Sequence, residues 1–196
     1  MHLVTLLGVI EISQYHEQDW LALLDFTLIV LVLTVAYFTL VERASIGFGR
    51  LRPRSCSIYD DYFWKHERYW KLSEILHLEL FSGTPFKGLI WRLLGVKVGR
   101  KLYDDGIGIP EKMLVSIGDN CTIGQSVTIQ GHSLEDGAFK SDHIRIGDGC
   151  TIGRNCYVHY GVVMEDNVVI ECDSFLMKGE HVPANSTWRG NPAREI

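Results

Sequence analysis

The sequence lacks a basic surplus: 19 Lys and Arg stand against 24 Asp and Glu, giving a formal net charge of −5 over 196 residues. Nucleic-acid-binding proteins normally carry such a surplus, so we expect no nucleic-acid partner. Proline is scarce, at 5 residues, and the composition of 46% hydrophobic and 22% charged residues is unlike that of a disordered or collagen-like chain. The composition therefore predicts a folded protein that does not bind nucleic acid.

Cysteine is also sparse. Five cysteines are an odd number, which is awkward for a disulfide framework. No two of them are spaced as C-x-x-C, so the sequence indicates no metal site.

Charge is almost absent from residues 20–41, which read WLALLDFTLIVLVLTVAYFTLV and contain one ionisable residue, Asp25. Twenty-two helical residues span ~33 Å, and the hydrocarbon core of a bilayer is about 30 Å thick. We therefore expect a transmembrane helix over residues 20–42. A second apolar run, residues 1–12, predicts a partial transmembrane helix of a longer protein. It has no basic region or cleavage site of a signal peptide, the alternative.

The flanks of the long run predict its orientation. Residues 11–19 contain three acids and no Lys or Arg, whereas four arginines follow the run: Arg43, Arg50, Arg52 and Arg54. By the positive-inside rule, everything after Val41 lies on the cytoplasmic side of the cell membrane.

Residues 43–95 are predicted as a helical juxtamembrane linker. The stretch YDDYFWKHERYW, residues 59–70, interleaves aromatic rings with charges, which is typical of a helix in the headgroup layer. A role in gripping substrate is the alternative. Further on, Pro85 and Gly95 bracket a predicted short helix over residues 86–94.

A six-residue period runs from Ile117 to the end. Its units are IGDNCT, IGQSVT, IQGHSL and, after an interruption, IGDGCT, IGRNCY, VHYGVV, MEDNVV, IECDSF, LMKGEH and VPANST. The first place is aliphatic except at Met164, and the fifth is small except at Glu180. This pattern predicts a parallel β-solenoid over residues 96–196, with three short strands per coil. Three cysteines take the fifth place and are expected as small core residues: Cys121, Cys150 and Cys156.

These units resemble the hexapeptide-repeat acyltransferases, and so do the entry LIWRLLGVKVGRKL and the closing segment VPANSTWRGNPAREI with its G-N-P-A turn. The resemblance implies an all-β fold class, a left-handed parallel β-helix preceded here by α-helices. It also implies a homotrimer or a tandem-domain pseudo-trimer.

The interruption, residues 130–145, is the predicted active site, because long polar insertions in compact folds are commonly functional. In the acetyltransferase branch a histidine at this point is the general base, which implies that role for His132. The sequence departs from that branch at two positions: the branch has Trp where this chain has Thr151, and Pro where this chain has His143. A base with a pKa near 7 suits proton removal from an amine or hydroxyl.

A neighbouring carboxylate, Glu135 or Asp136, is expected to hold the tautomer of His132. The predicted substrate-binding residues are Lys140, Asp142, His143 and His159. Acids of the first coil, Asp104, Asp105 and Glu111, either attract a cationic amine or form a solvated face.

Two stretches, residues 73–86 and the H-x-x-E-D of residues 132–136, resemble the C-terminal membrane region of poly-ε-lysine-synthetase-like nonribosomal peptide synthetases. The resemblance implies amide-bond formation from a pantetheinyl thioester. The donor would be a phosphopantetheinyl carrier domain or a coenzyme A thioester, with no covalent cofactor in this chain. Two alternatives are an acetyl-CoA-dependent O- or N-acetyltransferase and a non-catalytic trimerising scaffold. A three-histidine zinc site of the γ-carbonic-anhydrase type would use the same fold, but its H-x4-H pair is missing.

Overall fold

The computed structural model describes residues 19–72 and 76–196. Two compact units divide the chain, one ending at Leu40 and the other covering Val41–Ile196. Residues 1–12, where a partial transmembrane helix is expected, lie outside the described residues.

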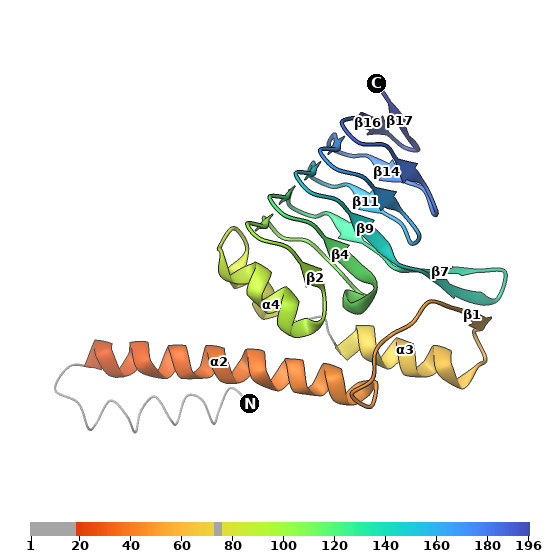
Figure 1. The fold of residues 1–196 in the computed structure, drawn as a ribbon. Helices are drawn as coiled ribbons and strands as arrows, with labels where there is room; N and C mark the ends of the chain where they lie inside the picture. Colours follow the sequence, from red (N-terminus) through yellow and green to blue (C-terminus); the bar gives the residue numbers. More distant parts are fainter. Residues whose placement is uncertain (1–18, 73–75) are drawn as a thin grey trace. The chain divides into compact units, whose positions relative to one another are not determined.

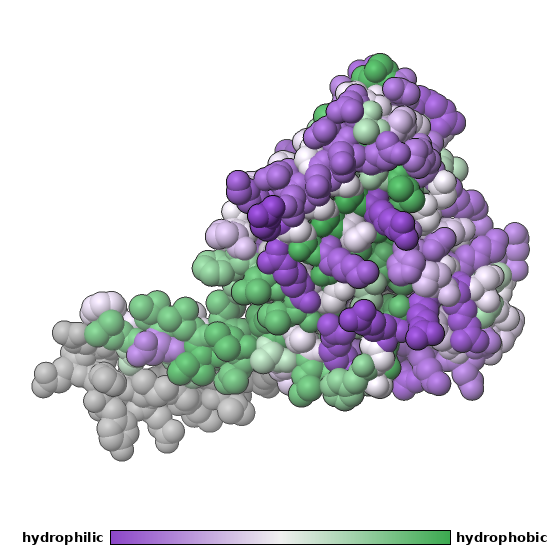
Figure 2. Space-filling view, viewed as in Figure 1, coloured by the Kyte–Doolittle hydropathy of each residue, from purple (hydrophilic) through white to green (hydrophobic). Residues whose placement is uncertain are grey.

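The first unit contains most of helix α2, Asp19–Ser45. Its segment Trp20–Ser45 contains an 18-residue stretch with a mean hydropathy of 2.4, of which 6% is buried, so its length and composition suffice to cross a membrane. Hydrophobic residues predominate on the face of α2 that Figure 2 shows. Within the helix, the Thr27 hydroxyl donates a hydrogen bond to the Leu23 carbonyl at 2.7 Å, which satisfies a polar group inside the apolar run.

The second unit begins with short elements that precede the solenoid: β1 (Arg54–Ser57), α3 (Asp61–Leu72), a 3-10 turn η1 (Leu76–Phe81) and α4 (Phe86–Leu94). Helix α4 has the predicted bounds. It ends at Gly95, whose φ of 107° is open to glycine at little cost and whose N–H bonds to the Arg92 carbonyl. Ile90, Trp91 and Leu94 on α4 are buried in the solenoid core.

Stacked coils form the solenoid, and each short strand pairs in parallel with its equivalent one coil away (Figure 1). Ile123, Ile152 and Ile170 pair in register across three coils, and all are buried. Cys121, Cys150 and Cys156 are buried core residues, as predicted. The remaining elements of the coils are β2 (Lys97–Val98), β3 (Tyr103–Asp104), η2 (Lys112–Leu114), β4 (Val115–Ile117), β5 (Thr122–Ile123), β6 (Thr128–Ile129), β9 (Ile144–Ile146), β10 (Thr151–Ile152), β11 (Tyr157–Val158), β12 (Val163–Met164), β13 (Val169–Ile170), β14 (Phe175–Leu176) and β15 (His181–Val182).

Antiparallel strand pairs also occur beside these parallel ones. Strand β16 (Thr187–Gly190) pairs with β17 (Ala193–Glu195) at the C-terminal end, and β7 (His132–Glu135) pairs with β8 (Ala138–Ser141). The architecture is thus a β-solenoid with an apolar N-terminal helix, with further helices outside the coils.

The interruption of the repeat is a β-hairpin rather than an open loop. Asp136 and Gly137 occupy its two turn positions with φ values of 52° and 70°, the geometry of a tight two-residue hairpin turn. Strand β1 adds a third strand to this hairpin by pairing with β8. The juxtamembrane linker therefore packs on the insertion that carries the predicted catalytic histidine.

Candidate active site

His132 begins β7, at the point where the hairpin leaves the coil, and is 8% exposed. Its Nδ1 lies 2.7 Å from Oε1 of Glu111, a fully buried carboxylate. The other carboxylate oxygen, Oε2, accepts the backbone N–H of Gly131 at 2.8 Å. Glu111 therefore holds both the backbone and the ring of the Gly131–His132 step. With Nδ1 donating to Glu111, the lone pair of the neutral imidazole is on Nε2.

Glycine at position 131 makes room for this close approach. A Cβ atom there would lie 3.0 Å from the Cβ of Glu111 and 3.2 Å from its Oε2, tighter than ordinary van der Waals contact. The backbone of the hairpin base therefore rests directly on the carboxylate that orients His132.

The expectation that Glu135 or Asp136 holds the imidazole needs correction, because Glu111 takes that place. The hairpin directs Glu135 elsewhere: both of its oxygens lie 2.6 Å from Lys178 Nζ, and Lys140 Nζ lies 3.6 Å away. The Lys178 ammonium lowers the pKa of Glu135. Asp136 is exposed at the hairpin turn.

The predicted substrate-binding residues lie on the hairpin base and on the adjacent coil. Asp142 and His143 are exposed, and the Asp142 carboxylate accepts the His143 N–H at 2.7 Å. His159 is half-buried beside Tyr157, its Nδ1 accepts the Tyr160 N–H at 2.9 Å, and burial lowers its pKa. Lys140 pairs with Glu135, and the charges of Glu135 and His132 both act on the pKa of His159.

The first-coil acids expected to attract an amine are not all available for that role. Asp104 is fully buried, where its carboxylate accepts the indole N–H of Trp91 and the N–H of Gly106. Glu111 is buried against His132. Asp105 remains exposed.

A residue that the sequence did not single out, His66, lies on the other side of Glu111. It is 2% exposed, and its Nε2 is 3.4 Å from Glu111 Oε1. The buried ring of Phe139 packs against both imidazoles, with centroid separations of 4.5 Å to His66 and 5.7 Å to His132. Burial lowers the pKa of His66 to about 4, so its imidazole is neutral at pH 7.

Helix α3 places His66 beside Glu111, because its residues 63, 66 and 69 lie along one face of the helix. Phe63 packs on Phe139, and Tyr69 is fully buried. This face packs inside the unit, while Trp64 is 57% exposed, and the place of the helix in the headgroup layer stays a prediction. Recurrence of aromatic residues every three positions in YDDYFWKHERYW was the available signal.

Donor atoms of His66, Glu111 and His132 all lie within 4.8 Å of one another, and imidazole and carboxylate are zinc-binding groups. Within this set, the 2.7 Å contact between Glu111 and His132 has the length of a charge-assisted hydrogen bond. The three side chains therefore form a hydrogen-bonded pair, Glu111 with His132, and the imidazole of His66 lies beside the same carboxylate.

Neutral burial of His66 predicts a pH dependence of stability. Between pH 6.5 and about 4 the unfolded chain protonates this imidazole while the folded chain does not. The free energy of unfolding should thus fall as the pH is lowered through this window, by about 3 kcal/mol in total. Chemical unfolding of the wild type and of His66→Leu at pH 7 and pH 4.5 measures the difference. Equal pH slopes in both proteins would contradict a buried neutral His66.

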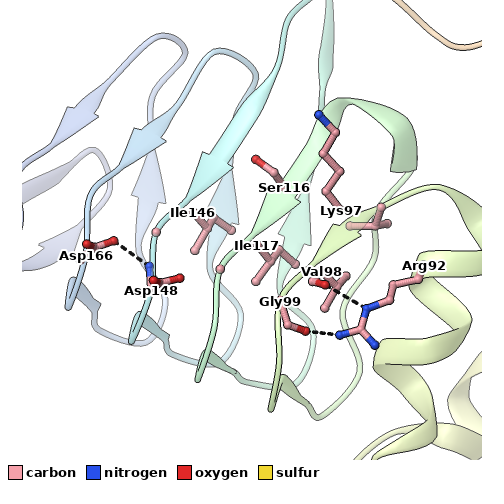
Figure 3. A pocket seen from close by; sticks show the side chains of 12 residues that line it. Arg92, Lys97, Val98, Gly99, Ser116, Ile117, Ile146, Asp148 and Asp166 are labelled. Carbon is pink, nitrogen blue, oxygen red and sulfur yellow. Dashed lines mark hydrogen bonds between the residues drawn. The ribbon is translucent and has the colours of Figure 1, made fainter.

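A groove of about 570 Å³ lies at a different corner of the solenoid and is lined by Arg92, Lys97, Asp148 and Asp166 among others (Figure 3). Its polar groups serve the fold: Asp166 accepts the Asp148 N–H at 2.8 Å, and Arg92 donates to the carbonyls of Val98 and Gly99. His132 does not line this groove, so we place the site at the hairpin base instead.

Comparisons with known proteins bear on this arrangement. Residues 114–139 and 143–174 match the family model described as the hexapeptide repeat of succinyl-transferase. A maltose O-acetyltransferase from Clostridium difficile 630 has a similar structure, with a TM-score of 0.50 and 20% identity over 80% of this chain and 95% of that one. The repeats and the stacked coils define the class: a hexapeptide-repeat transferase fold.

Two curated relatives are similar in sequence. Delta-poly-L-ornithine synthetase of Acinetobacter baumannii (strain AB307-0294) is 31% identical over 193 residues, which cover 95% of this chain but 14% of the relative. Gamma carbonic anhydrase 2, mitochondrial, of Arabidopsis thaliana is 35% identical over 78 residues, covering 40% of this chain and 24% of the relative. Residues 114–139 and 143–174 thus carry the hexapeptide repeat, and the chain spans only 14% and 24% of the lengths of these two relatives.

Proposed function

We propose that this chain is the condensing part of a membrane-anchored synthetase, which joins an amine to an acyl or aminoacyl group carried as a pantetheinyl thioester. The observation that carries the proposal is the buried Glu111–His132 pair, whose 2.7 Å contact orients an imidazole at the edge of the solenoid. The likeness to delta-poly-L-ornithine synthetase over 95% of this chain supports an amino acid as the acyl group.

The chemistry needs one base and one acid, and one imidazole can supply both. The amine nitrogen attacks the thioester carbonyl while His132 Nε2 removes its proton, so a C–N bond forms. Glu111 stabilises the resulting imidazolium through its hydrogen bond to Nδ1. The C–S bond then breaks, and the imidazolium returns the proton to the departing thiolate. Acyl donor and amine thus become an amide and a free thiol.

Membrane attachment is part of the proposal. Helix α2 would span the bilayer, and the arginines from Arg43 to Arg54 would keep the solenoid on the cytoplasmic side. In the proposed division, residues 20–42 form the anchor, 43–95 the linker and 96–196 a left-handed β-helix. Three such solenoids, from three chains or from tandem domains, would assemble as a trimer.

The donor is tested by offering three thioesters to the chain in lipid nanodiscs with L-ornithine as the amine. The donors are L-ornithyl-S-pantetheine, an L-ornithyl phosphopantetheinyl carrier domain and acetyl-CoA, and thiol release and amide product are both measured. We expect amide from the two ornithyl donors. Turnover of acetyl-CoA alone would instead indicate an acetyltransferase, and no amide from any donor would contradict the proposal.

A further inference from the structure

Both ring nitrogens of His66 are buried without a close hydrogen-bond partner among the described residues. Buried polar groups are normally paired, so an unpaired imidazole at this depth demands an explanation. An apolar residue would fill the space between α3 and Phe139 without that cost. The nitrogen that faces a carboxylate is Nε2, 3.4 Å from Glu111 Oε1.

The position of His66 relative to the pair is specific. Glu111 Oε1 has His132 Nδ1 at 2.7 Å and His66 Nε2 at 3.4 Å, and Oε2 is engaged by the Gly131 N–H. The two imidazoles stand edge to face, with centroids 5.5 Å apart and planes at 71°. The carboxylate is thus bounded by groups from the hairpin base and from the juxtamembrane helix.

We propose that His66 is a positioning residue for the reaction: its Nε2 lies 3.4 Å from Glu111 Oε1, and a small rotation of the ring lets Nε2–H donate to this carboxylate and keep it in the orientation that holds His132. The inference rests on the proposed function, in which His132 is the base. A neutral imidazole suits this role because it offers a donor to Glu111 without a second positive charge. A cation at position 66 would compete with the His132 imidazolium for the same carboxylate. Burial, which lowers the pKa of His66, keeps it neutral.

This role makes α3 part of the active site although it precedes the solenoid in sequence. Phe63 and His66 on α3 both contact Phe139 of β8, so the helix and the hairpin enclose the Glu111–His132 pair together. Without this helix, the Glu111 carboxylate would have fewer fixed neighbours and could change its orientation more freely.

The test compares His66→Leu, His66→Gln and Lys65→Leu in the full chain in nanodiscs, with L-ornithyl-S-pantetheine and L-ornithine as probes. His66→Leu should lower kcat by up to roughly 100-fold with little change in KM, since a shift of the base by about 1 Å costs that much. His66→Gln, whose amide can donate to Glu111, should recover most of the loss. Lys65→Leu is the matched control, because Lys65 is next to His66 in α3 but is exposed, and its kcat should stay near that of the wild type.

A second readout does not depend on turnover. In ¹⁵N-histidine NMR spectra, His132 should be mainly the Nδ1–H tautomer in the wild type and in His66→Gln, and should shift to a mixture of tautomers in His66→Leu. An unchanged kcat and unchanged tautomer in His66→Leu would overturn the inference. So would an equal loss in Lys65→Leu, or activity in the wild type that is removed by EDTA and restored by Zn²⁺. An active His132→Asn would instead overturn the proposed function itself.

Discussion

Replacing His132 with asparagine is expected to lower turnover by roughly 10²- to 10⁴-fold, the usual contribution of a general base. The asparagine amide can donate to Glu111 in place of Nδ1, so the buried carboxylate keeps its partner and the fold is retained. What the variant loses is the nitrogen that takes the proton from the amine. Thiol release and amide formation from L-ornithyl-S-pantetheine measure the loss.

The same substitution at His181 is the matched control. His181 on β15 is exposed, and its Nε2 pairs with Glu165 Oε1 at 3.1 Å, away from the hairpin base. His181→Asn should keep full turnover. Wild-type turnover in His132→Asn would contradict a base at this position.

Much of the solenoid follows from the sequence because its rule is local and repeated. An aliphatic residue every sixth position has one way to be buried in a stack of short coils, and Ile123, Ile152 and Ile170 pair as that rule requires. The small cysteines of the fifth place are buried for the same reason. Helix α4 was likewise predictable, since Gly95 marks its end through backbone conformation alone.

The partners of His132 were harder to predict because they come from elsewhere in the chain. Sequence proximity favoured Glu135 and Asp136, but a two-residue turn at Asp136–Gly137 makes a hairpin whose strand carries Glu135 to Lys178. Glu111 reaches His132 because successive coils stack, although 21 residues separate them. No repeat rule places α3, so nothing in the sequence connects His66 with the hairpin.

The second large effect concerns stability and arises next to Glu111. Lys112 and Glu42 form an ion pair at 3.3 Å with both side chains 2% exposed, and the Lys112 ammonium lies 5.6 Å from the centre of the Tyr69 ring. Replacing Lys112 with methionine keeps a long unbranched side chain at this position but leaves the Glu42 carboxylate buried without its cation. We expect the free energy of unfolding to fall by roughly 3 to 5 kcal/mol. Chemical unfolding of the chain in detergent micelles measures the change.

The double variant Glu42→Gln with Lys112→Met separates the loss of a charge partner from the loss of packing. Removing both charges also removes the desolvation cost that each carries, so the double variant should recover most of the stability lost in Lys112→Met. If the double variant is as unstable as the single one, the packing of the lysine stem would explain the effect instead of the ion pair.

The double variant also serves as a test of the active site. Because Lys112 directly follows Glu111, turnover per folded molecule reports whether the Glu42–Lys112 pair helps to place the Glu111 carboxylate that orients His132. Turnover equal to that of the wild type would show that the Glu42–Lys112 pair acts on stability alone.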